Sequence, residues 1–174
     1  NGISNLLKAN LRNLQDLYLN KNKIGISGAK FLSQADFPEL KILILSDNYL
    51  TNEGLRYLSK ANFPKLEKFS IGNNSIGNEG IFNLANSNFI QLKKLEMFAN
   101  RIDGDGIKYL SRANFRNLEE LNLDYNFIGY EEESLSYLNF LNLQKLSICK
   151  NYIGCEGIRN LLYANKPKLE TLDI

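Results

Sequence analysis

The sequence predicts an α/β solenoid in which short parallel strands alternate with helices along a stack of repeats. Three observations predict this fold. A leucine-rich pattern recurs at a fixed period, each copy opens with alternating apolar residues, and each copy continues into apolar residues at helical spacing. A fixed period of about 26 residues is the signature of stacked repeats, so the period decides the fold class before any local pattern does.

The repeats divide the chain of 174 residues into units within a single domain, residues 1–174. The pattern begins at Leu14, Leu40, Leu66, Leu92, Leu118, Leu143 and Leu169, and one step, from Leu118 to Leu143, is shorter than the others by a single position. We therefore expect a partial repeat at 1–13, full repeats at 14–39, 40–65, 66–91, 92–117, 118–142 and 143–168, and a partial repeat at 169–174. Neither end carries a recognisable polar capping repeat, so we expect either a piece of a longer protein or a protein whose ends lie outside this sequence.

The first part of each repeat predicts a short strand with one buried face, because its apolar residues alternate. In the third repeat we expect Leu66, Phe69 and Ile71 to be buried. Lys68, Ser70 and Gly72 should then be exposed. About seven such strands, each one repeat from the next, should pair in parallel and form the concave side of the solenoid.

An asparagine follows each strand and predicts a buried hydrogen-bonding column. Its members are Asn22, Asn48, Asn74, Asn100, Asn126 and Asn151. A buried amide can satisfy backbone groups of its own coil and of the adjacent coil, so a structural role is favoured over ligand contact. The glycines that come next, Gly25, Gly77, Gly129 and Gly154, suggest a turn with positive φ.

The second part of each repeat predicts a helix on the convex side. Acidic residues come two residues after the turn position, where a first-turn carboxylate favours the positive end of the helix dipole. A basic column, Lys30, Arg56, Lys108 and Arg159, should lie on the outer helix face. We interpret it as a solvated surface, with a binding role as the alternative.

The fifth repeat departs from the pattern. It is shorter by a single position, Glu132 replaces the second glycine, and Leu138 replaces a small residue. These changes predict a shortened or irregular helix start with Glu131, Glu132 and Glu133 exposed. The deviation is either a partner contact or sequence drift.

One unit has the form L-x-x-L-x-L-x-x-N-x-I-G-x-x-G followed by an apolar helical pattern, as at Leu66–Gly80. This motif resembles the leucine-rich repeat over the whole chain. The helix-forming second half and the Gly-x-x-Gly step are similar to the ribonuclease-inhibitor-like subfamily. The resemblance implies a right-handed β-α horseshoe with a parallel concave sheet and convex helices, and it implies a recognition scaffold rather than an enzyme.

The composition excludes several chemistries. The chain has no histidine, so His-based triads and the usual zinc ligand sets are absent. No P-loop motif occurs, and Asp103–Gly106 lacks the remaining ligands of a calcium loop. We expect no catalytic residues, no metal and no cofactor. Two cysteines, Cys149 and Cys155, make no disulfide framework, and we expect free thiols.

The charge and hydropathy indicate which partners to expect. Lys and Arg number 21 against 19 Asp and Glu, which is too balanced for a nucleic-acid surface. No apolar run is long enough to span a membrane. We expect a monomeric protein, intracellular and cytoplasmic, or in the host cytoplasm if it is a secreted effector.

Candidate binding residues are apolar or charged side chains at the positions predicted to face solvent on the concave side. One cluster lies near the N-terminal end and consists of Tyr18, Ile42, Ile44 and Tyr49. A second lies toward the C-terminal end and consists of Phe98, Tyr125, Phe127 and Tyr152, ringed by Glu96, Arg101, Asp124 and Lys150. Aromatic anchors inside a charged rim are typical of interaction hot spots. For Tyr49, Phe127 and Tyr152 the alternative is that they cover the turn and stack on one another. Phe98 is expected to stand bare in the middle of the exposed face, which favours partner contact.

We therefore predict a non-catalytic protein-interaction module that grips a protein partner with its concave face and adjacent loops. The alternative is a substrate-recognition or regulatory segment of a larger enzyme or of a secreted bacterial effector. Binding of carbohydrate outside the cell fits less well, because disulfide-bonded end caps are absent.

Overall fold

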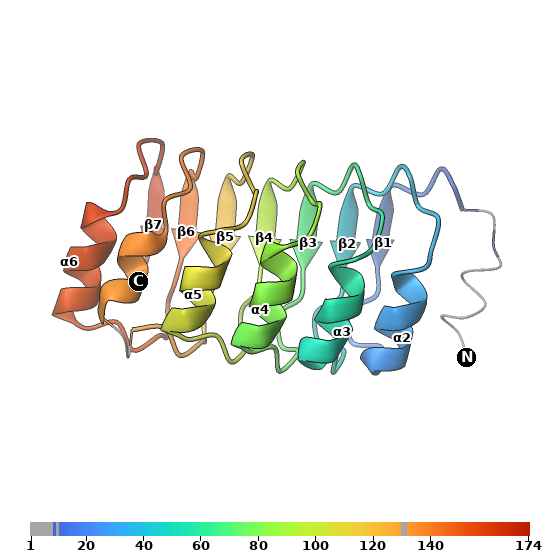
Figure 1. Ribbon diagram of the computed structural model, residues 1–174, viewed down its shortest axis with the longest axis horizontal. Helices are drawn as coiled ribbons and strands as arrows, with labels where there is room; N and C mark the ends of the chain where they lie inside the picture. The colour runs from blue at the N-terminus through green and yellow to red at the C-terminus, as the bar shows by residue number, and fades with distance from the viewer. Residues whose placement is uncertain (1–8, 10, 130–131) are drawn as a thin grey trace.

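The computed structural model describes residues 9, 11–129 and 132–174. Seven parallel strands form one open sheet in chain order: β1 (Asp16–Tyr18), β2 (Ile42–Ile44), β3 (Lys68–Ser70), β4 (Lys94–Glu96), β5 (Glu120–Asn122), β6 (Lys145–Ser147) and β7 (Thr171–Asp173). They alternate with α2 (Gly25–Leu32), α3 (Thr51–Leu58), α4 (Asn78–Ala85), α5 (Gly104–Leu110), the 3₁₀-helix η1 (Glu132–Tyr137) and α6 (Cys155–Tyr163). The helices lie side by side in one layer over the sheet (Figure 1). The predicted α/β solenoid is confirmed.

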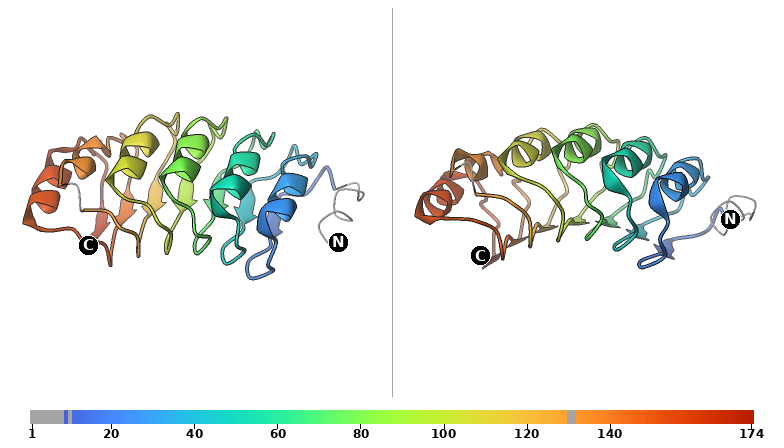
Figure 2. Two further views of the ribbon diagram at one scale, coloured as in Figure 1. Left: turned by 60° about the horizontal axis from the view of Figure 1, so that its bottom comes forward. Right: turned by 90° about the horizontal axis from the view of Figure 1, so that it is seen from below.

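The curvature of the stack is shallow. Seen from below, the helices follow the outer side of a gentle arc and the sheet follows the inner side (Figure 2). The helices therefore cover the convex side and the sheet forms the concave side, as the resemblance implies. The arc stays open and falls well short of a closed horseshoe.

The strand register reproduces the sequence period. Leu17 pairs with Leu43, Leu43 with Phe69, and Phe69 with Leu95. The step from β5 to β6 pairs Leu121 with Leu146, which is where the short repeat removes one position. Because each pairing joins equivalent positions, side chains of one column lie next to one another along the whole sheet.

The core fills the space between the sheet and the helices. Leu95 of β4 and Ile81 of α4 are completely buried. Phe63 stacks on the rings of Phe37 and Phe89, with centroids 6.5 and 6.3 Å apart. This phenylalanine column closes the core beneath the loops that return from helix to strand.

The last return loop replaces the phenylalanine with Lys166. Its side chain is half-buried, and its ammonium donates hydrogen bonds to the carbonyls of Leu161 (2.8 Å) and Ala164 (3.1 Å) at the end of α6. Burial lowers the pKa of Lys166 to about 8. The end of the phenylalanine column is therefore polar.

The asparagine column is a hydrogen-bonded ladder, as predicted. The Asn74 side chain is buried, and its Oδ1 accepts from the backbone N–H groups of Asn48 (2.9 Å) and Leu50 (3.2 Å) in the preceding coil. Its Nδ2 donates to the carbonyls of Leu45 in that coil and Ile71 in its own, both at 3.0 Å. Each amide thus joins two coils and pairs backbone groups that burial in the turn would otherwise leave unsatisfied.

The turn after each strand differs from the prediction. Gly25 and Gly129 have positive φ, but Gly77 and Gly154 do not. Positive φ instead recurs at the residue just before each ladder asparagine: Lys21, Asp47, Asn73, Ala99, Tyr125 and Lys150. The backbone N–H of most of these residues donates to a carbonyl of the next coil; that of Tyr125 donates to the carbonyl of Cys149 (2.9 Å). These hydrogen bonds between coils therefore set the positive φ.

The second glycine of the Gly-x-x-Gly step permits close packing of neighbouring coils. A Cβ on Gly106 would lie 2.6 Å from Cγ2 of Ile102 and 2.7 Å from Oδ1 of Asn78, which belongs to the preceding helix. Asn78 itself accepts from the N–H of Asp103 (3.2 Å) and donates to its carboxylate (2.6 Å). These contacts join the N-termini of α4 and α5.

The fifth repeat has an irregular helix, as predicted. The 3₁₀-helix η1 replaces an α-helix, and Leu135 and Leu138 are completely buried beneath it. Glu133 is exposed. Glu131 lies outside the described residues, so its predicted exposure is not tested, and the same holds for the side chain of Glu132.

Candidate functional site

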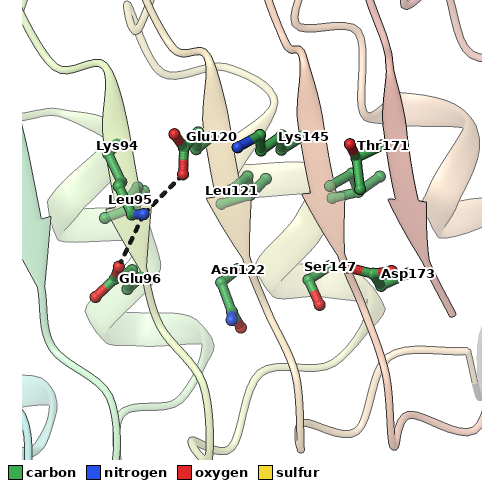
Figure 3. Close-up of a pocket in the computed structure, with 11 residues that line it drawn as sticks. Lys94, Leu95, Glu96, Glu120, Leu121, Asn122, Lys145, Ser147, Thr171 and Asp173 are labelled. Carbon is green, nitrogen blue, oxygen red and sulfur yellow. Dashed lines mark hydrogen bonds and ion pairs between the residues drawn. The ribbon is translucent and has the colours of Figure 1, made fainter.

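The concave face of β3 to β5 carries a network of ion pairs between neighbouring strands. The ammonium of Lys94 lies 2.7 Å from Oε2 of Glu120 and 3.4 Å from Oε1 of Glu96 (Figure 3). Lys68 reaches the same Glu96 oxygen at 3.2 Å. The hydrogen bond between Lys94 and Glu120 raises the pKa of Lys94 and lowers the pKa of Glu120. These charges neutralise one another within the sheet.

A shallow hollow of about 190 Å³ lies beside this network. Its polar lining comes from β4 to β7 and includes Asn122, Lys145, Ser147, Thr171 and Asp173 (Figure 3). Sites for small molecules are usually larger, about 300–1,000 Å³, and mostly apolar. The hollow therefore favours contact with a macromolecular surface over enclosure of a small ligand.

Phe98 does not stand bare on this face, so that prediction is wrong. It is half-buried, and a Cβ placed on Gly72 would lie 2.4 Å from its ring atoms Cε1 and Cζ. The ring thus covers the glycine of the preceding repeat. Gly72 and Ser70, predicted to be exposed, are buried, and Ser70 shares a hydrogen bond of 2.9 Å with the hydroxyl of Ser46.

The residues of the N-terminal cluster differ in exposure. Tyr18 and Tyr49 are 61% and 67% exposed. Ile42 and Ile44 are half-buried within β2, and Ile44 pairs in register with Tyr18. The apolar surface at this end is therefore uneven, because the two tyrosines are exposed and the two isoleucines are half-buried.

The C-terminal cluster is exposed at every member except Phe98. Tyr125, Phe127 and Tyr152 are 59%, 43% and 55% exposed, and we call these three residues the aromatic edge. The rings of Phe127 and Tyr152 are stacked, with centroids 6.2 Å apart and planes at 7°. The stacking that we considered as an alternative to partner contact is present, yet it leaves a large part of both rings in contact with solvent.

The four charged residues predicted around this cluster fall into two groups. Glu96 is paired with Lys68 and Lys94. The carboxylate of Asp124 accepts hydrogen bonds of 2.7 Å from the Ser147 hydroxyl and the Cys149 backbone N–H. Arg101 and Lys150 are exposed, and neither forms an ion pair within the part of the chain that the structure describes.

The basic column on the convex side is mostly paired with the first-turn acids. Arg56 contacts Glu53 at 2.8 Å and Arg159 contacts Glu156 at 2.8 Å, in both cases three residues apart on one helix. Lys108 and Asp105 form the same pair at 3.2 Å. This pairing supports our interpretation of the column as a solvated helix face.

The described residues contain no group of three or more His, Cys, Asp or Glu side chains that could hold a metal ion. Asp103 is the N-cap of α5, and its carboxylate accepts from the Asp105 backbone N–H at 3.0 Å. Cys149 and Cys155 are free thiols. The geometry thus gives the Asp103–Gly106 segment a role in helix capping.

Our sequence reasoning missed the contact between Phe98 and Gly72 and the ion pairs between repeats. Phe98 lies one full repeat after Gly72, and Glu120 lies one full repeat after Lys94, so both contacts join equivalent positions of adjacent repeats. A comparison of each position with its neighbours in the next repeat would have revealed them.

The architecture defines a solenoid of stacked repeats, and comparison with known proteins agrees on this class. A family model described as Leucine Rich repeat matches residues 10–33, 39–59 and 64–85. These three segments are leucine-rich repeats, a class that commonly mediates protein–protein interaction and is typically non-catalytic. The search of curated proteins gave no match. In the described part of the chain, no helix has the length and apolar character that a membrane span requires.

Proposed function

We propose that this chain is a non-catalytic protein-interaction module, and that it holds a protein partner with its concave face and the adjoining strand-to-helix loops. The observation that carries the proposal is the aromatic edge. Three large aromatic side chains of two adjacent repeats are about half exposed and lie together at the ends of parallel strands. Aromatic residues are enriched in binding hot spots, because they bury much area and lose little side-chain entropy.

The exposure of Tyr125 supports the same proposal. Its φ of +56° recurs at this position in the other repeats, so the fold sets the backbone there whatever the residue. The adjacent repeats place Ala99 and Lys150 at this position. Tyr125 gains little from folding because the residue is 59% exposed, so its contribution is expected in a complex.

We infer the ribonuclease-inhibitor-like subfamily from the helices on the convex side. α2, α3, α4, α5 and α6 are α-helices of seven to nine residues, and the Gly-x-x-Gly step packs their N-termini together. Our sequence analysis associated these two features with that subfamily.

The proposal is tested by affinity capture from lysate of the cells that make the protein, with quantitative mass spectrometry. The test variant is Tyr125→Ser with Tyr152→Ser. The matched control is Tyr137→Ser with Tyr163→Ser, which makes the same exchange at exposed tyrosines of η1 and α6. We expect a protein retained by wild type and by the control and lost from the test variant. Equal retention by all three would contradict the proposed surface, after circular dichroism has shown that both variants fold.

A further inference from the structure

We propose that the partner presents an acidic segment to the aromatic edge, with carboxylates on both sides of an apolar anchor. This inference rests on the proposed function and specifies the chemistry of the partner. Its basis is that the cations around the aromatic edge are exposed and form no ion pair with the described residues, whereas the nearby carboxylates are already bound within the solenoid.

The two cations lie at opposite corners of the aromatic edge. Arg101, Phe127 and Tyr152 occupy one position of three consecutive repeats. Two residues earlier, Ala99, Tyr125 and Lys150 occupy another. Adjacent parallel strands lie about 4.8 Å apart, so Arg101 lies one repeat before Phe127 in the first row, and Lys150 lies one repeat after Tyr125 in the second row.

The carboxylates of the same repeats are less available to a ligand than these two cations, because they already contact other groups of the solenoid. Asp124 is held by Ser147 and Cys149, and Glu96 is held by two lysines. Asp103, two residues after Arg101, caps α5 and accepts a second hydrogen bond from Nδ2 of Asn78. Asp124 and Asp103 keep their negative charge, but both are half-buried and hydrogen-bonded within the solenoid, so Arg101 and Lys150 are the exposed charges beside the aromatic edge.

Electrostatic complementarity governs which partner such a surface accepts. When a partner buries the aromatic edge, Arg101 and Lys150 lose hydrogen bonds to water. Carboxylates of the partner opposite these two cations replace those hydrogen bonds. A neutral partner would leave the cations partly desolvated, and a basic one would add repulsion. An acidic segment with one apolar side chain between its carboxylates would place that side chain on the rings and a carboxylate opposite each cation.

Aromatic rings beside cations can also stack nucleobases and bind phosphates. The ring arrangement disfavours this ligand here. Phe127 and Tyr152 are already stacked on one another, so their inner faces are not free to receive a base. The balanced charge of the chain as a whole offers no extended basic track for a nucleic-acid backbone.

The test is selection of a displayed library of random peptides on the immobilised protein. We expect enrichment of peptides rich in Asp and Glu around an aromatic or aliphatic residue, and loss of that enrichment on the variant Tyr125→Ser with Tyr152→Ser. No enrichment, or enrichment without acidic residues, would overturn the inference. A single-stranded oligonucleotide that binds more tightly than the selected peptides and is lost from the same variant would also overturn it.

One enriched peptide is then titrated by fluorescence anisotropy at low and high salt. We expect Arg101→Ser with Lys150→Ser to weaken binding about tenfold, roughly threefold for each rim charge. The matched control, Lys60→Ser with Arg112→Ser, removes the same two charge types at exposed sites after α3 and α5 and should leave binding unchanged. Equal losses in both variants, or equal binding of the peptide with Asn and Gln in place of its acids, would contradict the inference.

The two proposals fail in different ways. If affinity capture finds a partner that depends on the aromatic edge but its bound segment is not acidic, the inference is wrong and the proposed function stands. If capture depends on another face of the solenoid, both are wrong.

Discussion

The ring of Phe98 lies over the backbone of Gly72, so close that a Cβ on the glycine would be 2.4 Å from two ring atoms. The two residues occupy equivalent positions of adjacent repeats, and the absence of a side chain on one makes room for the other. The contact fills the middle of the concave face. It separates the N-terminal cluster from the hollow and the aromatic edge on the C-terminal side.

This contact predicts energetic coupling between the two positions. Gly72→Ala should push the ring toward solvent and lose part of its burial, at a cost of about 1 kcal/mol in the free energy of unfolding. In a Phe98→Ala background the same substitution should cost almost nothing. Urea denaturation of the four proteins in this cycle measures the coupling, and additive effects would mean that the ring does not rest on Gly72.

The asparagine ladder predicts that the stability lost on replacing an asparagine depends strongly on its place in the column. Asn74→Ala removes a buried amide and leaves several backbone groups of two coils without partners, so we expect a loss of about 3 kcal/mol. Asn22 begins the same column, but it is exposed, and its Nδ2 donates to two carbonyls of its own coil. Asn22→Ala should therefore cost under about 1 kcal/mol. Similar losses in the two variants, measured by urea denaturation, would contradict the ladder as the source of stability.

The packing of coils at the second glycine predicts a different pair of outcomes. Gly106→Ala introduces a methyl group within 2.7 Å of Ile102 and Asn78, and we expect a loss of about 1–3 kcal/mol from overpacking. Gly154 has a negative φ and open space around its Cβ position, so Gly154→Ala should change stability by less than about 1 kcal/mol, because the lower N-cap preference of Ala and the lower entropy of the unfolded chain oppose each other. Thermal unfolding of both variants tests this. A neutral Gly106→Ala would show that the helices need no such close approach.

The ion pair between Lys94 and Glu120 predicts that the free energy of unfolding decreases at acidic pH. The pKa of Glu120 is lowered from its ordinary value of 4.5, chiefly by its hydrogen bond to Lys94. The stabilisation is therefore complete above about pH 4.5 and is lost as the pH falls through the lowered value. Because both side chains are about one third exposed, we expect only about 0.5 kcal/mol.

Denaturation of wild type and Glu120→Gln from neutral pH down to about pH 3 measures this contribution. The difference between the two proteins should be constant at neutral pH and shrink in acid. A difference that grows as the pH falls would contradict the pair.

The fold was predictable from the sequence because the repeat period imposes the strand register. Once Leu17, Leu43 and Phe69 are recognised as equivalent, parallel pairing and the direction of the core follow. The predictions that were wrong concern features that depend on a neighbouring repeat. The position of Phe98 depends on the glycine one repeat earlier, and the positive φ of Tyr125 depends on a carbonyl of the following coil.

The candidate surface was predictable only in part, for the same reason. Exposure of Tyr125, Phe127 and Tyr152 follows from their positions in the repeat. The distinction between hydrogen-bonded and unpaired charges does not, because it depends on side chains of the next repeat. The hydrogen bond from Ser147 to Asp124 joins two repeats and is evident only once both side chains are placed.

The most direct test of the central claim is site-specific photocrosslinking. A photoreactive phenylalanine analogue placed at Tyr125 reports what contacts the aromatic edge, and the same analogue at Tyr163 of α6 serves as the control because that position is also exposed, at 77%. We predict one protein crosslinked through position 125 and not through position 163, with the crosslink in an acidic segment of that protein. A partner crosslinked through position 163 and not through position 125 would contradict the account.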